Sequence, residues 1–138
     1  MVDNEIREHI DKISSQMRRQ YSEMLRELGL HVGQDNLLCK LWNENGMTQM
    51  ELREQLRCEL PTVTNMVKTL EKKEFVYRKK DADDGRVSRV YLTEIGWGVR
   101  DPIEEMWRSQ QDKLLKGLTD EERVLLNKFL QQMEKNLR

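Results

Sequence analysis

The sequence predicts a mainly α-helical fold with one small β-hairpin, and three observations support this prediction. Glycine and proline, which interrupt regular structure, number only seven and two among 138 residues. Charged residues make up 36% of the chain, above the roughly 25% typical of globular proteins. Such a high content is expected of long helices that expose a charged face to solvent. The hydrophobic period is helical over most of the chain and changes to two only between residues 75 and 92.

The length of 138 residues corresponds to about one domain, so we expect a single domain over residues 1–138 and no two-domain enzyme. No apolar run approaches the ~20 residues needed to cross a bilayer, and no secretory leader is visible, so we expect a cytoplasmic protein. The two cysteines and two isolated histidines match neither a disulfide framework nor a zinc-ligand pattern. We therefore expect no metal, no cofactor and no membrane partner.

The first 28 residues predict one long helix, because apolar residues recur every three or four positions. The apolar residues are Ile6, Ile10, Ile13, Met17, Tyr21, Met24 and Leu28. Polar residues occupy every other face, so this narrow stripe needs a partner, which we expect in a second chain.

Three further helices are predicted between residues 34 and 73. The first runs from Gln34 with Leu37, Leu38, Leu41 and Trp42 inward, and is expected to end at Asn45-Gly46. The second begins at a capping box formed by Thr48 and Glu51 and ends near Arg57-Cys58-Glu59. The third carries the core stripe Val63, Met66, Val67 and Leu70.

The segments Phe75–Lys80 and Val87–Leu92 alternate like strands, and residues 81–86 between them form a turn sequence, so together they predict a β-hairpin. Thr93 is the expected N-cap of a fifth helix, which is expected to bend at Asp101-Pro102 and to be interrupted at Gly117. A second capping box, Thr119 to Glu122, is expected to open a last helix. The inward residues of that helix are Leu125, Leu126, Phe129, Leu130, Met133 and Leu137.

The face of the third short helix opposite its core stripe is polar and uncharged to basic. Residues 60–90 hold eight basic and five acidic residues, a local charge of +3 in a chain of net charge −1. This asymmetry favours a basic module on an acidic body, which meets phosphate locally, over a merely solvated helix face.

Two short helices joined by a tight turn and followed at once by a hairpin are the order of a winged helix-turn-helix. The second helix of such a pair fits the major groove of DNA, and the hairpin tip reaches the minor groove beside it. Arg86 suits the tip because a narrow minor groove concentrates negative potential. Asp84 either orients its guanidinium or simply forms the turn. The candidate DNA-contacting residues are Pro61, Thr62, Thr64, Asn65, Lys68, Thr69 and Lys72 on the helix and Arg78, Asp84, Arg86 and Arg89 in the hairpin.

On these motifs the sequence resembles the MarR family of winged-helix transcription regulators. Asp84-Gly85-Arg86 and the later Leu92-Thr93-Glu94-Ile95-Gly96 are similar to that family's wing tip and following helix start, and residues 60–73 are similar to its recognition helix. The resemblance implies a homodimer, built from residues 1–33 and 98–138, that carries a DNA-binding region over residues 34–97. It further implies binding to a pseudo-palindromic operator, usually with repression, and release by a small-molecule effector or by thiol oxidation.

The sequence departs from the family pattern at three positions near the recognition helix. Arg57 and Glu74 stand where the family commonly has glycine in a turn, and Glu59 stands where a serine-like N-cap is usual. A side chain at positive φ costs roughly 1–2 kcal/mol. We therefore expect either a different local turn or some loss of stability at Arg57 and Glu74.

A protein-interaction or dimer-scaffold module without DNA binding is the alternative function. An enzyme is not expected, since no activated nucleophile, metal cluster or glycine-rich phosphate loop is present. Cys39 and Cys58 are expected to be buried apolar residues, and His9 and His31 to face solvent. Trp42, Trp97 and Trp107 are expected at core-facing helical positions.

Overall fold

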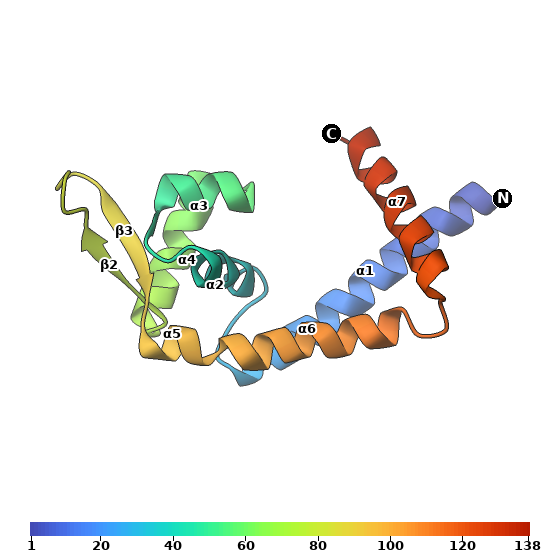
Figure 1. Cartoon of the computed structure of the whole chain (residues 1–138), viewed down its shortest axis with the longest axis horizontal. Helices are drawn as coiled ribbons and strands as arrows, with labels where there is room; N and C mark the ends of the chain where they lie inside the picture. The colour runs from blue at the N-terminus through green and yellow to red at the C-terminus, as the bar shows by residue number, and fades with distance from the viewer. The chain divides into compact units, whose positions relative to one another are not determined.

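The computed structural model describes all residues from Met1 to Arg138 and divides them into two compact units, Met1–Met106 and Trp107–Arg138. Figure 1 shows the elements in chain order. The helices are α1 (Val2–Glu27), α2 (Gln34–Asn43), α3 (Gln49–Leu56), α4 (Leu60–Lys72), α5 (Glu94–Gly98), α6 (Arg100–Leu114) and α7 (Asp120–Asn136). The strands are β1 (Met47–Thr48), β2 (Val76–Lys80) and β3 (Ser88–Leu92). The predicted fold class, mainly helical with a hairpin wing, is confirmed.

The sheet has three antiparallel strands in the order β1-β3-β2. The predicted hairpin pairs Val76 with Leu92 at its base and Lys80 with Ser88 near its tip. The third strand, β1, was not predicted from the sequence, because two residues are too few to show a period. It pairs Met47 with Val90, and the preceding Gly46 N–H donates to the carbonyl of Val90 at 3.0 Å. This strand fixes the wing to the segment that enters α3.

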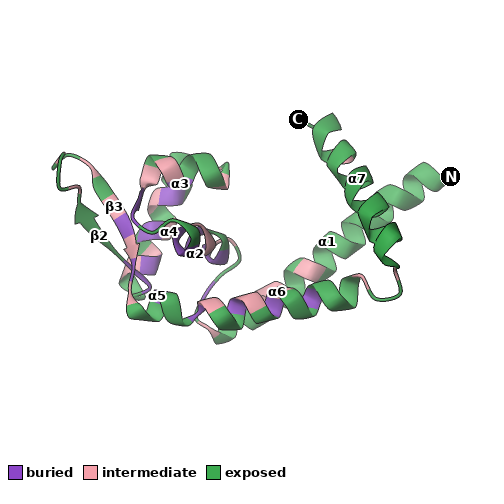
Figure 2. Cartoon of the chain, viewed as in Figure 1, coloured by how far each residue is buried: buried purple, intermediate pink, exposed green.

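The hydrophobic core of the first unit lies between α2, α3, α4 and the sheet, as the buried residues in Figure 2 show. The apolar stripe of each helix faces it. Its fully or almost fully buried members include Leu37, Leu38, Leu41, Trp42, Leu52, Val63, Val67, Leu70, Phe75, Val76, Val90 and Leu92. The indole Nε1 of Trp42 donates to the carbonyl of Gly96 at 3.0 Å, which ties α2 to α5.

The long N-terminal helix α1 is confirmed, and it ends in a glycine-dependent turn. Gly29 has a φ of 79°, and the Leu30 N–H after it donates to the Leu25 carbonyl at 2.9 Å. The side chains of Leu25 and Leu30 are both buried. Lys73 Nζ donates to the Gly29 carbonyl at 2.8 Å, linking the end of α4 to the end of α1. By contrast, the apolar residues Ile6, Ile10 and Ile13 are 41–43% exposed.

One predicted helix boundary and half of one predicted capping box differ from the structure around β1. Helix α2 ends at Asn43, before the expected Asn45-Gly46, and Gly46 at φ 84° serves the entry into β1 instead. The Glu51 N–H donates to Thr48 Oγ1 at 3.1 Å, as expected for an N-cap. The Glu51 carboxylate, however, lies 3.7 Å from Arg89 Nη1, so the arginine of the sheet replaces the reciprocal half of the capping box.

The predicted fifth helix is two helices, because the chain breaks at Val99, not at Asp101-Pro102. Pro102 lies in the first turn of α6, where its missing N–H removes no helical hydrogen bond. The break also resets the helical register. Trp97 is consequently 42% exposed and does not face the core, contrary to the sequence expectation, whereas Ile103 and Met106 are buried.

In the second unit, α7 begins with the predicted capping box in full. The Glu122 N–H donates to Thr119 Oγ1 at 3.2 Å, and the Thr119 N–H donates to Glu122 Oε1 at 2.8 Å, which lowers the pKa of the Glu122 carboxyl. Gly117 precedes it at φ 90°. The large apolar residues of α7 are exposed, and in Figure 2 almost the whole helix is coloured so.

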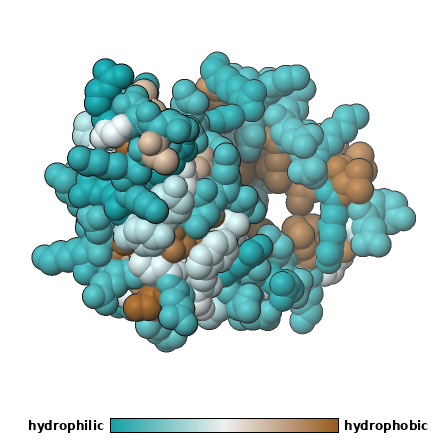
Figure 3. All heavy atoms as spheres, turned by 60° about the vertical axis from the view of Figure 1, so that its left-hand side comes forward, coloured by the Kyte–Doolittle hydropathy of each residue, from teal (hydrophilic) through white to brown (hydrophobic).

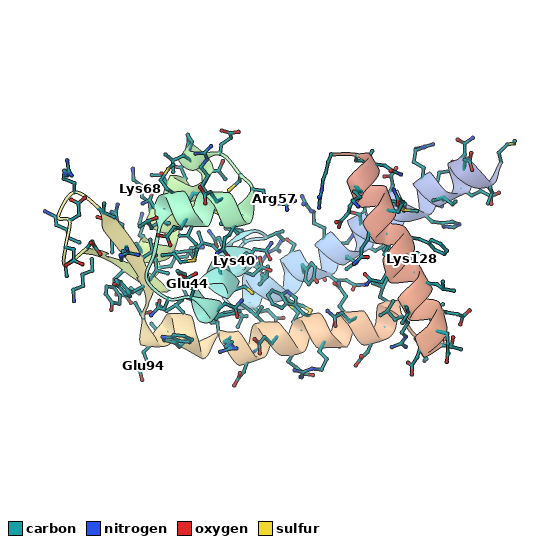
Figure 4. The ribbon with its side chains drawn as sticks, turned by 45° about the horizontal axis from the view of Figure 1, so that its top comes forward. Lys40, Glu44, Arg57, Lys68, Glu94 and Lys128 are labelled. Atoms are coloured by element: carbon teal, nitrogen blue, oxygen red, sulfur yellow. The ribbon has the colours of Figure 1, made fainter.

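Arg57 and Glu74, which stand where the resemblance led us to expect glycine, adopt the left-handed conformation at φ 53° and 68°. Of the two expectations, a different local turn or a loss of stability, the structure favours the second, because both residues keep a positive φ. Figure 4 labels Arg57, which lies at the C-terminal end of α3 and donates its N–H to the Arg53 carbonyl at 2.9 Å.

Replacing Arg57 by glycine is expected to stabilise the protein by about 1 kcal/mol, because glycine has no Cβ to clash in this conformation. Arg53→Gly, four residues earlier within α3, is the matched control and is expected to destabilise by about 1 kcal/mol. Urea denaturation of the three proteins compares them. A lower unfolding midpoint for Arg57→Gly than for the wild type contradicts the account of strain.

Candidate nucleic-acid interface

Helices α3 and α4 pack against each other and are joined by a tight turn. After the left-handed Arg57, Cys58 is half-buried and Glu59 adopts an extended conformation as the residue that precedes α4. The Glu59 carbonyl accepts from Thr62 N–H at 3.1 Å, but its side chain makes no capping hydrogen bond. Pro61 fits the first turn, which needs no donor from it. The sequence departure at Glu59 thus leaves the start of α4 intact.

The outer face of α4 presents most of the predicted contact residues to solvent. Pro61, Thr62, Asn65, Lys68 and Lys72 are exposed, and Thr69 is half-buried. Figure 4 labels Lys68 on this helix. The face therefore offers a hydroxyl, an amide and two ammonium groups along one side of a helix, without an acidic side chain among them.

Thr64 differs from these residues because it is half-buried and faces α3. Its hydroxyl donates to Gln49 Oε1 at 2.8 Å. Gln49, the first residue of α3, is therefore a part of this interface that sequence reasoning missed. Its only sequence signal was its place next to the capping residue Thr48.

In the hairpin, Arg78 on β2 is already paired. Its guanidinium donates to both oxygens of Glu71 on α4, at 2.9 Å from Nη2 and 3.3 Å from Nε. This bidentate contact holds β2 against α4.

The turn of the hairpin is ordered by two aspartates. Asp81 Oδ2 accepts the N–H groups of Asp83 and Asp84 at 3.3 and 3.1 Å. Asp84 Oδ1 in turn accepts the Arg86 N–H at 3.1 Å and the Arg86 Nε at 3.2 Å. Asp84 therefore both forms the turn and contacts the Arg86 guanidinium, because the same oxygen accepts from the backbone and from the side chain of Arg86. The Arg86 side chain is 91% exposed, so its cation lies on the outside of the wing.

Arg89 lies nearer the base of the hairpin and contacts three partners. Its Nε donates to Asp81 Oδ1 at 2.9 Å, its Nη1 donates to the Gly46 carbonyl at 3.0 Å, and Nη1 lies 3.7 Å from Glu51 Oε1. The hydrogen bond from Arg89 is the main reason that the pKa of Asp81 lies below its usual value. Asp81 and Gly46 were not among the predicted site residues.

The first unit thus carries one face with two distinct cationic elements, the outer side of α4 and the wing. Lys79 and Lys80 on β2 are also exposed. Figure 3, in which the side of the molecule bearing the wing turns toward the viewer, shows hydrophilic residues over most of that face. Such a surface is suited to hydrogen bonds and phosphate contacts.

The remaining polar candidates do not form a site for a metal. No group of three or more His, Cys, Asp or Glu side chains is placed to hold an ion. Cys39 in α2 and Cys58 in the turn between α3 and α4 are half-buried, less than the full burial that we expected. Burial raises the pKa of the Cys39 thiol and keeps it protonated. His9 and His31 are exposed, as expected.

Known proteins share both the sequence and the fold. The MarR family model matches residues 31–88, which include α2 to α4 and the wing tip. The solved structure of the transcriptional regulator SlyA superposes with a TM-score of 0.85 at 28% identity, over 96% of this chain and 93% of that one. The chain is therefore similar to the MarR family in sequence over residues 31–88 and to the SlyA structure in fold over nearly its whole length.

Two further relatives widen the comparison. The crystal structure of the Staphylococcus aureus MepR–DNA complex matches with a TM-score of 0.82 at 25% identity, over 94% of each chain. The transcriptional repressor IacR of Pseudomonas putida is 27% identical over 127 residues, 91% of this chain and 75% of its own. The MarR family consists of transcriptional regulators, not enzymes. None of the helices is both long and apolar enough to cross a bilayer.

Proposed function

We propose that this chain binds a pseudo-palindromic double-stranded DNA operator as a homodimer and represses transcription until a small-molecule effector releases it. The observation that carries the proposal is the exposed, acid-free outer face of α4 beside the exposed Arg86 of the wing, within one unit. In this proposal residues 34–97 are the DNA-binding region, and the protein acts in the cytoplasm.

The two elements suit the two grooves of B-DNA. A helix enters the ~12 Å wide major groove, where Asn65 can pair with adenine through both ends of its amide. Thr62 and Lys68 lie on the same face of α4 and can reach a base or a phosphate. Arg86 on the wing suits the narrower minor groove. Repression is also the role stated for the relative IacR.

The proposal assigns residues 1–33 and 98–138 to dimerisation. In α1, Ile6, Ile10 and Ile13 are 41–43% exposed, and in α7 Val124 and Phe129 are 71% and 55% exposed. Continuous apolar stripes of this kind are rarely left in water. A second copy of the chain that supplies the same stripes is therefore the proposed cover.

Sedimentation of the wild type at micromolar concentration is expected to give twice the 16.6 kDa of one chain. Ile10→Glu places a charge in the α1 stripe and is expected to shift the protein toward the monomer. Lys12→Glu also introduces a carboxylate, on the polar side of the same helix and with a larger change of charge, and is expected to leave the dimer unchanged. A 16.6 kDa species for the wild type contradicts the proposed homodimer.

Selection of bound sequences from a random pool of DNA duplexes tests the proposed function as a whole. Enrichment of an inverted repeat whose halves are about 34–36 Å apart is expected, because the two recognition helices follow the two-fold axis of the dimer. Failure to enrich any sequence overturns the proposal and favours a protein-interaction or dimer-scaffold module.

A further inference from the structure

The wing of this protein is tied to the start of α3 by one continuous chain of polar contacts. The chain begins at the Gly46 carbonyl and at Glu51, which meet the Arg89 guanidinium at 3.0 and 3.7 Å. It continues from Arg89 Nε to Asp81 Oδ1 at 2.9 Å. Gly46 and Asp81 are 43 and eight residues from Arg89 in the sequence. The Arg89 side chain therefore adds a polar link to the backbone pairing that already joins β1 to β3 and Asp81 to Val87.

From Asp81 the same chain reaches the tip of the wing. Its second oxygen, Oδ2, accepts the N–H groups of Asp83 and Asp84, and Asp84 then holds Arg86 through both backbone and guanidinium. Asp81 also donates its own N–H to the Val87 carbonyl at 2.8 Å, which closes the loop. The position of Arg86 therefore depends on that of Arg89 through the carboxylates of Asp81 and Asp84.

We propose that Arg89 is a positioning residue for DNA binding, which acts through Asp81 to hold Arg86 in a fixed position relative to α3 and α4. This inference rests on the proposed function. It revises the sequence expectation for Arg89, which was a direct DNA contact. About a third of the Arg89 side chain is exposed, against 91% for Arg86, and its donors are already directed at protein acceptors.

The geometry gives Asp81 and Asp83, two of the three aspartates of the wing turn, opposite roles in DNA binding. A carboxylate near DNA ordinarily repels the phosphates, so removing it strengthens binding. Asp81 is different, because its charge holds the anchor together, and its loss frees the wing. Asp83 lies two residues after Asp81 and is exposed, and only its backbone N–H takes part in the chain of contacts.

The test compares Asp81→Asn and Asp83→Asn, which change the net charge equally, on the selected operator. Asp81→Asn is expected to weaken binding about tenfold, the size of one lost charge-assisted contact. Asp83→Asn is expected to bind as tightly as the wild type or more tightly. Operator binding by Asp81→Asn that equals or exceeds that of Asp83→Asn overturns the inference. A wild type that binds no DNA overturns the proposed function itself, and the inference with it.

A double-mutant cycle separates positioning from direct contact. Arg89→Gln and Arg86→Ala are each expected to weaken operator binding about tenfold, and the double variant no more than twofold beyond either. In the Arg86→Ala background, Arg89→Gln is expected to leave the salt dependence of binding unchanged. A hundredfold loss in the double variant, with a further fall in the salt slope of about one per half-site, means that Arg89 contacts phosphate itself and overturns the inference. Thermal melting of each variant confirms that a loss of binding is measured on folded protein.

Discussion

Gly96→Ala is expected to destabilise the protein by about 3 kcal/mol or more, the upper end of the range for overpacking. A Cβ at this position would lie 2.2 Å from the backbone oxygen of Phe75 and 3.0 Å from a methyl carbon of Leu92. The Phe75 oxygen cannot withdraw, because it already accepts the Thr93 N–H at 3.1 Å. Helix α5 would have to lift off the sheet and lose the hydrogen bond from Trp42 to the Gly96 carbonyl.

Gly98→Ala is the matched control for this substitution. Gly98 lies two residues later in the same helix and has open space where a Cβ would stand. Alanine there is expected to leave stability unchanged or raise it by up to about 1 kcal/mol, since glycine is a poor helix former. Urea unfolding of both variants gives the comparison. Equal unfolding midpoints for the two would show that the close approach at Gly96 has no energetic consequence.

The second large effect is expected on DNA. Asn65→Ala should cost about 1–3 kcal/mol on the specific operator and much less on a random duplex, because its amide reads a base edge. Arg86→Ala should weaken binding to both duplexes alike and lower the salt slope by about one per half-site, since its guanidinium acts through charge.

Affinities of the two variants for operator and random duplex across a salt series distinguish these kinds of loss. Uniform, equal losses for both variants would mean that α4 reads no bases. Wild-type affinities for Arg86→Ala would mean that the wing does not touch DNA.

The sequence predicted those parts of the fold in which a periodic pattern is long enough to exclude alternatives. Helices α1, α2 and α4 follow from their apolar stripes, and the hairpin follows from two alternating runs around a turn. Strand β1 has only two residues, and its pairing with Val90 is set by a partner more than 40 positions away. The error at Trp97 has the same origin, because one pattern was extended across the break at Val99.

The candidate site shows a similar division. The exposure of Asn65 and Lys68 follows from the helical period once the core stripe of α4 is known. The hydrogen bond of Thr64 to Gln49 and the anchor of Arg89 depend on side chains that tertiary packing brings together. From residue type alone, Arg86 and Arg89 are equivalent candidates for a DNA contact. In the structure Arg86 is exposed, whereas Arg89 donates hydrogen bonds to Asp81 and Gly46.

In the proposed function, two copies of the chain read two half-sites of one DNA duplex. The most direct measurement is the affinity of the wild type for the selected operator and for the same duplex with one half-site scrambled. Since each mismatched base pair costs about 1–3 kcal/mol, the scrambled duplex is expected to bind at least about a hundredfold more weakly. Equal affinity for the two duplexes would contradict the claim, because it would mean that a single half-site supplies all of the specific binding.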